Sequence, residues 1–105
     1  MDTILIATQD PHTNTAIRRI LSPDDNIHIA DSADQIWELI KTGACDCLFI
    51  DLSLMAALSD TLDHKEDPKT LVQQIKGLRP LMAIVIIADN DDVRKAVRYV
   101  KNGAN

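Results

Sequence analysis

The sequence predicts an α/β protein in which helices cover both faces of a parallel sheet. Four short apolar runs, rich in β-branched residues, alternate with four segments that repeat apolar residues at helical spacing. With right-handed crossovers this βαβαβαβα alternation gives a parallel sheet, for which we expect the strand order 2-1-3-4. Because 105 residues, 46% of them hydrophobic, suffice for one core, residues 1–105 are predicted to form a single domain.

The first half of the chain supplies two strands and two helices. Strands are expected at Thr3–Ala7 and, with the weaker alternation of an edge strand, at Asn26–Ala30. A helix is predicted over 12–21, and a second begins at Ser32, which has capping-box spacing to Gln35, and ends near Gly43. The residues expected on the buried faces of these helices are Ala16, Ile17, Ile20, Leu21, Ile36, Leu39 and Ile40.

The middle of the chain contains the central strand, predicted at Cys45–Asp51, in which apolar residues lead directly to one acid. The sequence that follows, up to Pro68, has no sustained period, so we expect a loop with one helical turn at Met55–Leu58. Asp67 and Pro68 are typical of an N-cap and a first helical position, and they predict a third helix. Its buried face would hold Leu71, Val72, Ile75 and Leu78.

The last strand is predicted at Met82–Ala88, and a helix with a stop signal at Asn102-Gly103 follows it. In the order 2-1-3-4 this strand lies at an edge of the sheet, where no charge or proline protects it from pairing. We therefore expect that a fifth strand and helix are missing from this stretch or are supplied by a partner. The apolar face of the last helix would consist of Val93, Ala96, Val97 and Val100.

Composition excludes several classes of function. A formal net charge of −5 argues against direct binding of nucleic acid, and no apolar run is long enough to span a membrane. The N-terminus lacks the features of a signal peptide, so a cytoplasmic protein is expected. Cys45 and Cys47, two apart in the predicted strand, should share one face as free thiols; the alternative, a metal half-site, lacks nearby histidine or further cysteine.

Polar residues follow three strands whose carboxyl ends would meet at one edge of the sheet. They are the segment 8–10 after the first strand, Asp51 after the third, and Ala88-Asp89 after the fourth. An acid in that place is a candidate for chemistry, although Asp51 could instead cap the following turn. The three glycines stand where helices end, so no phosphate-binding loop is predicted, and no catalytic triad is apparent. We therefore expect that the protein is not an enzyme.

Three segments resemble the receiver domain of bacterial two-component response regulators, which has a flavodoxin-like three-layer α/β/α fold. TILIATQDP is similar to the first strand and acidic corner of that family, CLFIDLSL to its phosphoacceptor strand, and IVIIADNDDVRKAVRYVKNGAN to its fourth strand and helix. The resemblance implies that Asp51 accepts a phosphoryl group from a histidine kinase or phosphotransfer protein with the help of Mg²⁺. It also implies an output domain beyond Asn105, such as a DNA-binding domain or an ATPase, and transcription regulation as one outcome.

The chain departs from the family pattern at the positions that serve this chemistry. The family's acid pair at the end of strand one is Thr8 and Gln9 here, with Asp10 next in the chain, and its hydroxyl residue on strand four is Ala88. The resemblance thus points to Asp51, Asp10 and Gln9 as metal ligands, and to Thr8 and Ala88 as the positions that face the phosphoryl group. Because an amide replaces a carboxylate, Mg²⁺ binding is expected to be weak.

Two hypotheses about function follow from these residues. In the first, Asp51 is phosphorylated and controls an attached or partner output domain; in the second, the chain is a degenerate receiver that acts through protein contacts without phosphorylation. The basic surface of the last helix, around Tyr99, is the expected site of self-association into a homodimer, with a solvated face as the alternative. Its basic residues are Arg94, Lys95, Arg98 and Lys101.

Overall fold

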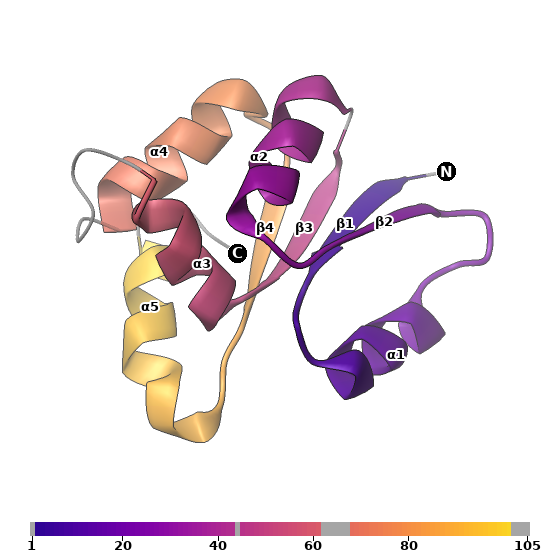
Figure 1. Cartoon of the computed structure of the whole chain (residues 1–105), viewed down its shortest axis with the longest axis horizontal. Coiled ribbons are helices and arrows are strands. Elements are labelled where there is room, and N and C mark those ends of the chain that lie inside the picture. Colours follow the sequence, from indigo (N-terminus) through magenta and orange to yellow (C-terminus); the bar gives the residue numbers. More distant parts are fainter. Residues whose placement is uncertain (1, 44, 62–67, 102–105) are drawn as a thin grey trace.

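The computed structural model describes residues 2–43, 45–61 and 68–101, and its centre is a four-stranded parallel sheet (Figure 1). The strand order is β2-β1-β3-β4 and every pairing is parallel, which confirms the predicted topology. The first two strands have the predicted bounds, and the third and fourth are slightly shorter than expected. The strands are β1 (Thr3–Ala7), β2 (Asn26–Ala30), β3 (Cys47–Asp51) and β4 (Ala83–Ile87).

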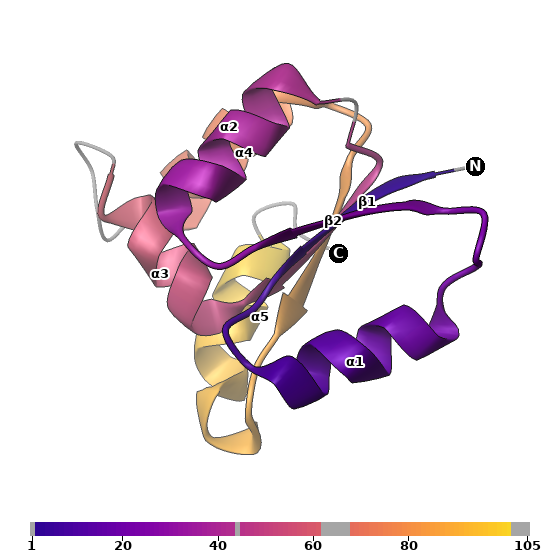
Figure 2. The same ribbon diagram turned by 45° about the vertical axis from the view of Figure 1, so that its right-hand side comes forward.

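Helices cover both faces of this sheet and give the described part of the chain a three-layer α/β/α architecture. Figure 2 shows α1 on one side of the strands and α2 and α3 on the other. A single turn of 3₁₀ helix, Asn90–Asp92, precedes the last helix. The helices are α1 (Pro11–Ile20), α2 (Ala33–Thr42), α3 (Leu52–Ser59), α4 (Pro68–Leu78) and α5 (Val93–Lys101).

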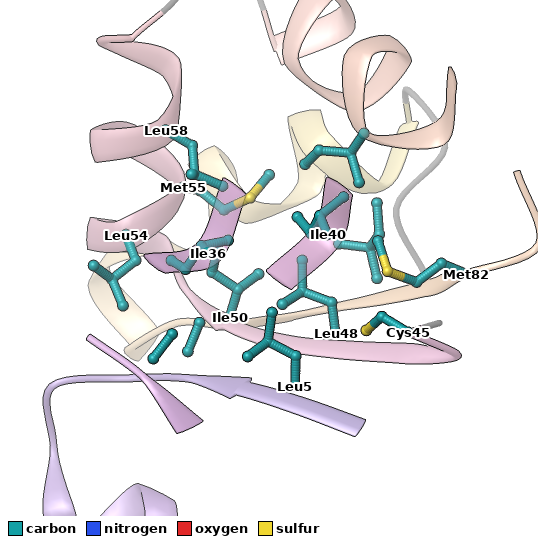
Figure 3. Close-up of a cluster of buried hydrophobic side chains, with 14 of the residues drawn as sticks. Leu5, Ile36, Ile40, Cys45, Leu48, Ile50, Leu54, Met55, Leu58 and Met82 are labelled. Atoms are coloured by element: carbon teal, nitrogen blue, oxygen red, sulfur yellow. The ribbon is translucent and has the colours of Figure 1, made fainter. Parts of the chain in front are cut away.

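The larger hydrophobic core lies between the sheet and helices α2, α3 and α4 (Figure 3). Leu48 and Ile50 of β3 are fully buried there, together with Ile36 and Ile40 of α2. A smaller core joins Ile4, Ile6 and Ile17 beneath α1 on the other face. Since β3 alternates its side chains between the two cores, it is fixed from both sides, and the position of its last residue is fixed with it.

The region after β3 differs from the prediction. A loop with one helical turn was expected, but α3 begins at Leu52, directly after the strand, and continues to Ser59. Its sequence, LSLMAALS, is apolar on all sides and therefore lacks the contrast between faces that marks an amphipathic helix. Leu54, Met55 and Leu58 of this helix are buried in the larger core. The predicted N-cap of α4 and the stop signal at 102–103 lie outside the described residues, and the fifth strand stays a prediction.

Two helices differ most from the buried faces expected for them, and in α4 the predicted core residue Leu78 is also 36% exposed. In α1 Ile17 is buried, whereas Ile20 is 76% exposed. In α5 the side chain of Tyr99 packs against the larger core, and Val93 and Val97 remain 49% and 40% exposed. The predicted faces of both helices were therefore partly wrong, because the pattern of apolar residues indicates a helix without stating which stripe its neighbours cover.

The two cysteines are free thiols, as predicted, but they do not share a face. Because β3 begins only at Cys47, Cys45 lies before the strand and turns into the larger core, whereas Cys47 packs beside the smaller one. The Cys45 thiol donates a hydrogen bond to the carbonyl of Cys47, and burial raises the pKa of both thiols. This arrangement is that of packing residues.

Arg79, which follows α4, is bonded through its side chain to the C-terminus of α2. Its guanidinium donates hydrogen bonds to the carbonyl oxygens of Gly43 and Lys41, at 2.8 and 3.2 Å. These carbonyls belong to the C-terminus of α2, which has no further helical turn to satisfy them. Arg79 thus joins α4 to the end of α2.

None of the helices in the described residues is both long and apolar enough to cross a bilayer.

Candidate functional site at the carboxyl edge of the sheet

Three strands end side by side at the carboxyl edge of the sheet. Ala7 of β1 is in register with Ile50, and Asp51 of β3 is in register with Ile87 of β4. The residues that follow these positions therefore meet at one place, as the sequence predicted. Asp51 itself is half-buried at the end of β3.

The carboxylate of Asp51 is bonded to the segment that follows β1. The Thr8 hydroxyl donates a hydrogen bond to Asp51 Oδ2 at 2.5 Å, and the backbone N–H of Gln9 donates to the same oxygen at 3.3 Å. Thr8 is only 4% exposed, and its own oxygen accepts a hydrogen bond from the backbone N–H of Asp10 at 3.1 Å. Because the Thr8 oxygen accepts the N–H of Asp10, its own proton is free to point at Asp51. Thr8 is therefore the donor of the hydrogen bond between Thr8 and Asp51.

Asp51 also occupies the N-cap position of α3, which was the alternative interpretation of this residue. Its backbone has the extended conformation of an N-cap, with φ −64° and ψ 146°, but its side chain makes no capping hydrogen bond. The carboxylate therefore turns toward β1 and away from the helix that it precedes.

Asp10 serves as the N-cap of α1. Its carboxylate accepts hydrogen bonds from the backbone N–H of His12 at 3.0 Å and from the hydroxyl of Thr13 at 2.8 Å. The Thr13 hydroxyl, followed by the His12 N–H, lowers the pKa of Asp10 below its usual value. Both oxygens of this carboxylate are therefore bonded within the first turn of α1.

The side chain of Gln9 extends toward a different corner of the molecule. Its amide nitrogen donates to the backbone carbonyl of Asp31, between β2 and α2, at 3.2 Å. The residue thus contacts Asp51 through its backbone only.

Next to Asp51 the molecular surface is hollowed into a cavity of about 190 Å³. Four carboxylate residues line it, namely Asp10, Asp51, Asp89 and Asp92, together with Ala88 and neighbouring residues. Asp89 and Ala88 are exposed, and Ala88 presents only a methyl group to the cavity. The structure therefore brings Asp10, Asp51 and Ala88 to one cavity, whereas Thr8 and Gln9 approach Asp51 from the side of β1.

These side chains do not fit a magnesium site in the arrangement that they adopt. Mg²⁺ requires an octahedron of oxygen ligands and is usually held by one or two carboxylates. Asp10 is bonded within α1, Gln9 within the β2–α2 corner, and Oδ2 of Asp51 with Thr8 and Gln9. Within residues 2–43, 45–61 and 68–101, no group of three or more histidine, cysteine, aspartate or glutamate side chains is placed to hold a metal ion.

The order of the strands and the three layers define a class of fold, that of response regulator receiver domains. No protein-family model matches the sequence, and no curated protein does. The likeness is therefore one of structure.

Solved structures of receiver domains superpose on nearly the whole chain. A response regulator from Thermotoga maritima has a TM-score of 0.73 at 18% identity, covering 99% of this chain and 80% of that one. A CheY-like receiver domain protein from Methanospirillum hungatei has a TM-score of 0.71 at 20% identity, with coverage of 100% and 78%. A CheY-like protein (tadZ) from Pseudomonas aeruginosa has a TM-score of 0.68 at 21% identity, covering 100% of this chain and 83% of that one. At these identities the comparison shows the fold.

Sequence reasoning treated Thr8 as the loss of an acid and missed its hydrogen bond to Asp51. A signal for it was present, because a hydroxyl residue directly after a buried strand, beside a strand that ends in an acid, has few other partners. The cap formed by Asp10 was also foreseeable, since an acid followed by proline commonly begins a helix.

Proposed function

We propose that this chain is a signalling module with the receiver fold that acts through contacts with other proteins, without magnesium-assisted phosphorylation of Asp51. The hydrogen bond from Thr8 to Asp51 Oδ2 carries the proposal, because one of the two carboxylate oxygens that could bind a cation is already held by a neutral donor. Asp10 and Gln9, the other expected ligands, have partners elsewhere. A module that signals by contact keeps the fold and its surfaces and has no need of the metal.

A second candidate function is that of a phosphoacceptor. Asp51 lies at the end of the central strand and lines an open cavity, which favours this role. A carboxylate oxygen of Asp51 would form a bond to phosphorus while the phosphorus–nitrogen bond of a phosphohistidine breaks, and the histidine of the kinase or phosphotransfer protein would take up a proton. The phosphorylated form would then control an output domain.

Chemical phosphorylation separates the two candidates. The purified chain is incubated with acetyl phosphate, or with beryllofluoride as a mimic of the phosphoryl group, in the presence and absence of Mg²⁺. We expect no increase in mass and no change in the amide NMR spectrum that depends on Asp51. Stoichiometric modification that Asp51→Ala abolishes would overturn the first candidate in favour of the second.

A designed variant provides the matched control for this experiment. Gln9→Asp together with Ala88→Thr replaces the amide and the methyl group by the carboxylate and hydroxyl that the receiver family has at these positions. We expect this variant to bind Mg²⁺ more tightly than the natural chain in a calorimetric titration. An unchanged affinity would mean that these two residues do not limit the site.

Self-association through α5 is the proposed mode of contact with a second copy. Three valines at helical spacing, Val93, Val97 and Val100, are 40–49% exposed on this helix, among the basic residues Arg94 and Lys95. Apolar side chains that are exposed side by side are candidates for a contact surface. We expect sedimentation velocity to show a concentration-dependent shift that Val97→Glu removes. A single species at all concentrations would exclude the homodimer.

A further inference from the structure

The hydrogen bonds that reach Asp51 within the described residues come from Thr8 and Gln9, on the side of β1. On the side of β4 the neighbouring residue is Ala88, whose methyl group can neither donate nor accept a hydrogen bond. A change in the charge or orientation of the Asp51 carboxylate therefore acts first on the segment that follows β1.

Gln9 connects this segment to the beginning of α2. Its backbone N–H reaches Asp51 Oδ2, and its side-chain amide donates to the carbonyl of Asp31. The N–H of Asp31 in turn donates to Oε1 of Gln35 at 3.0 Å, and the N–H of Gln35 to the Ser32 hydroxyl at 3.4 Å. These hydrogen bonds, with the covalent bonds of Gln9, Asp31 and Gln35 between them, connect the acid at the end of β3 to the first turn of α2.

Each of these bonds is exposed at the surface, so each contributes a small free energy that a change at Asp51 can offset. The Gln9 side chain is bonded to Asp31 in this structure, and because it is exposed, water can replace that partner. An element with two states, biased from both ends, is the physical requirement for coupling between sites.

We propose that Gln9 is a positioning residue that couples the state of Asp51 to the β2–α2 corner, formed by Asp31, Ser32 and Gln35. The proposal rests on the proposed function in one respect, that the carboxyl edge of the sheet is the signalling site. The N-terminus of α2 is then the surface that responds when a partner contacts Asp51 or when a modification neutralises it.

Amide hydrogen exchange, measured by NMR on the ¹⁵N-labelled full chain, tests this coupling. Asp51→Ala removes the acceptor of the Gln9 N–H, and we expect exchange at the amides of Asp31 and Gln35 to accelerate about threefold or more, the effect of losing one weak hydrogen bond. Amides of α5 should keep their rates. In a Gln9→Met background, which keeps the backbone N–H but lacks the side-chain donor, Asp51→Ala should cause no further acceleration.

Matched variants keep the test decisive. Gln73→Met makes the same change on an exposed turn of α4 and should leave the response to Asp51→Ala intact. If Asp51→Ala fails to fold, Asp51→Asn removes the charge and one of the two acceptor oxygens, and it should produce a smaller acceleration at the same amides. Equal acceleration at Asp31 with and without the Gln9 side chain, or a response centred on α5, would overturn the proposal. Because no phosphoryl donor is used, this result is independent of whether Asp51 can be phosphorylated.

Discussion

The two sides of Asp51 are built differently. On the side of β1, the hydroxyl of Thr8 and the N–H of Gln9 donate to its carboxylate, and Asp10 closes the first turn of α1. On the side of β4, the adjoining residue is Ala88, and the helix beyond it exposes valines to solvent. The fold is common to both sides, but in the described residues the polar contacts of this carboxylate lie on one of them.

This difference shows how a carboxylate at the end of a strand can be held from one side alone. A hydroxyl and a backbone N–H can hold a carboxylate oxygen in place without a cation, because both are donors of ordinary strength. The variants below test how unequal the two sides are.

The largest difference is expected in packing. Ile17 of α1 is buried, and Ile17→Ala should lower the free energy of unfolding by about 2–5 kcal/mol, the usual range for truncating a buried aliphatic residue. Val97 of α5 is 40% exposed, and Val97→Ala should change the free energy of unfolding by no more than about 0.5 kcal/mol. Urea denaturation measures both values. Similar losses in the two variants would mean that the sides are equally packed.

A smaller effect is expected for the hydroxyl of Thr8. Thr8→Val keeps the shape of the side chain but leaves Asp51 Oδ2 and the N–H of Asp10 without this partner, which should lower the free energy of unfolding by about 1–3 kcal/mol. Thr8→Ser retains the hydroxyl and should recover most of the loss in the same denaturation experiment. If serine and valine behave alike, the methyl group matters more than the hydrogen bonds.

On the other side, Ala88→Ser should have almost no effect on stability. The position is exposed, and the new hydroxyl can be solvated, so the free energy of unfolding should change by less than about 0.5 kcal/mol. A stabilisation well above this limit would indicate that the serine reaches Asp51, and the two sides would then be more alike than the structure suggests.

The smallest effect is expected from pH. Hydrogen bonds from Thr13 and His12 lower the pKa of Asp10 in the folded state. The ionised Asp10 therefore stabilises the fold, and this contribution is fully present at pH values above the pKa that Asp10 has in the unfolded chain. It is lost as the pH falls through the lowered folded pKa. Thermal unfolding followed by circular dichroism should therefore show a steeper loss of stability on acidification in the natural chain than in Asp10→Asn. Thr13→Val should flatten the slope in the same direction, and Thr13→Ser should preserve it.

Most of the fold could be predicted from the sequence because buried parallel strands are marked by continuous apolar runs. Thr3–Ala7 was predicted from such a run with its observed bounds, and Asn26–Ala30 from the polar–apolar alternation of an edge strand. The expected strand order 2-1-3-4 is the observed one. Of helix α3 only one turn, Met55–Leu58, was predicted, because the segment Leu52–Ser59 is largely apolar and shows no marked helical stripe. The orientation of α5 was also missed, since Tyr99 outweighs the smaller valines in contacting the core.

Less of the site could be predicted. The sequence indicated which residues would meet at the edge of the sheet, since that depends on strand order alone. It did not indicate where their hydrogen bonds go, because Asp10 and Gln9 each have several partners within reach and the choice depends on loop geometry. The roles of Asp51, Thr8 and Ala88 in any chemistry stay predictions.

The contacts of Arg79 have a consequence for how α2 can move. Its guanidinium holds the carbonyls of Lys41 and Gly43, so the last turn of α2 is anchored while the first turn is bonded only through exposed groups. A helix of ten residues is about 15 Å long. We therefore expect a disturbance at Ser32 to stay within the exposed first turn, because Ile36 is buried in the larger core and Arg79 holds the other end of the helix.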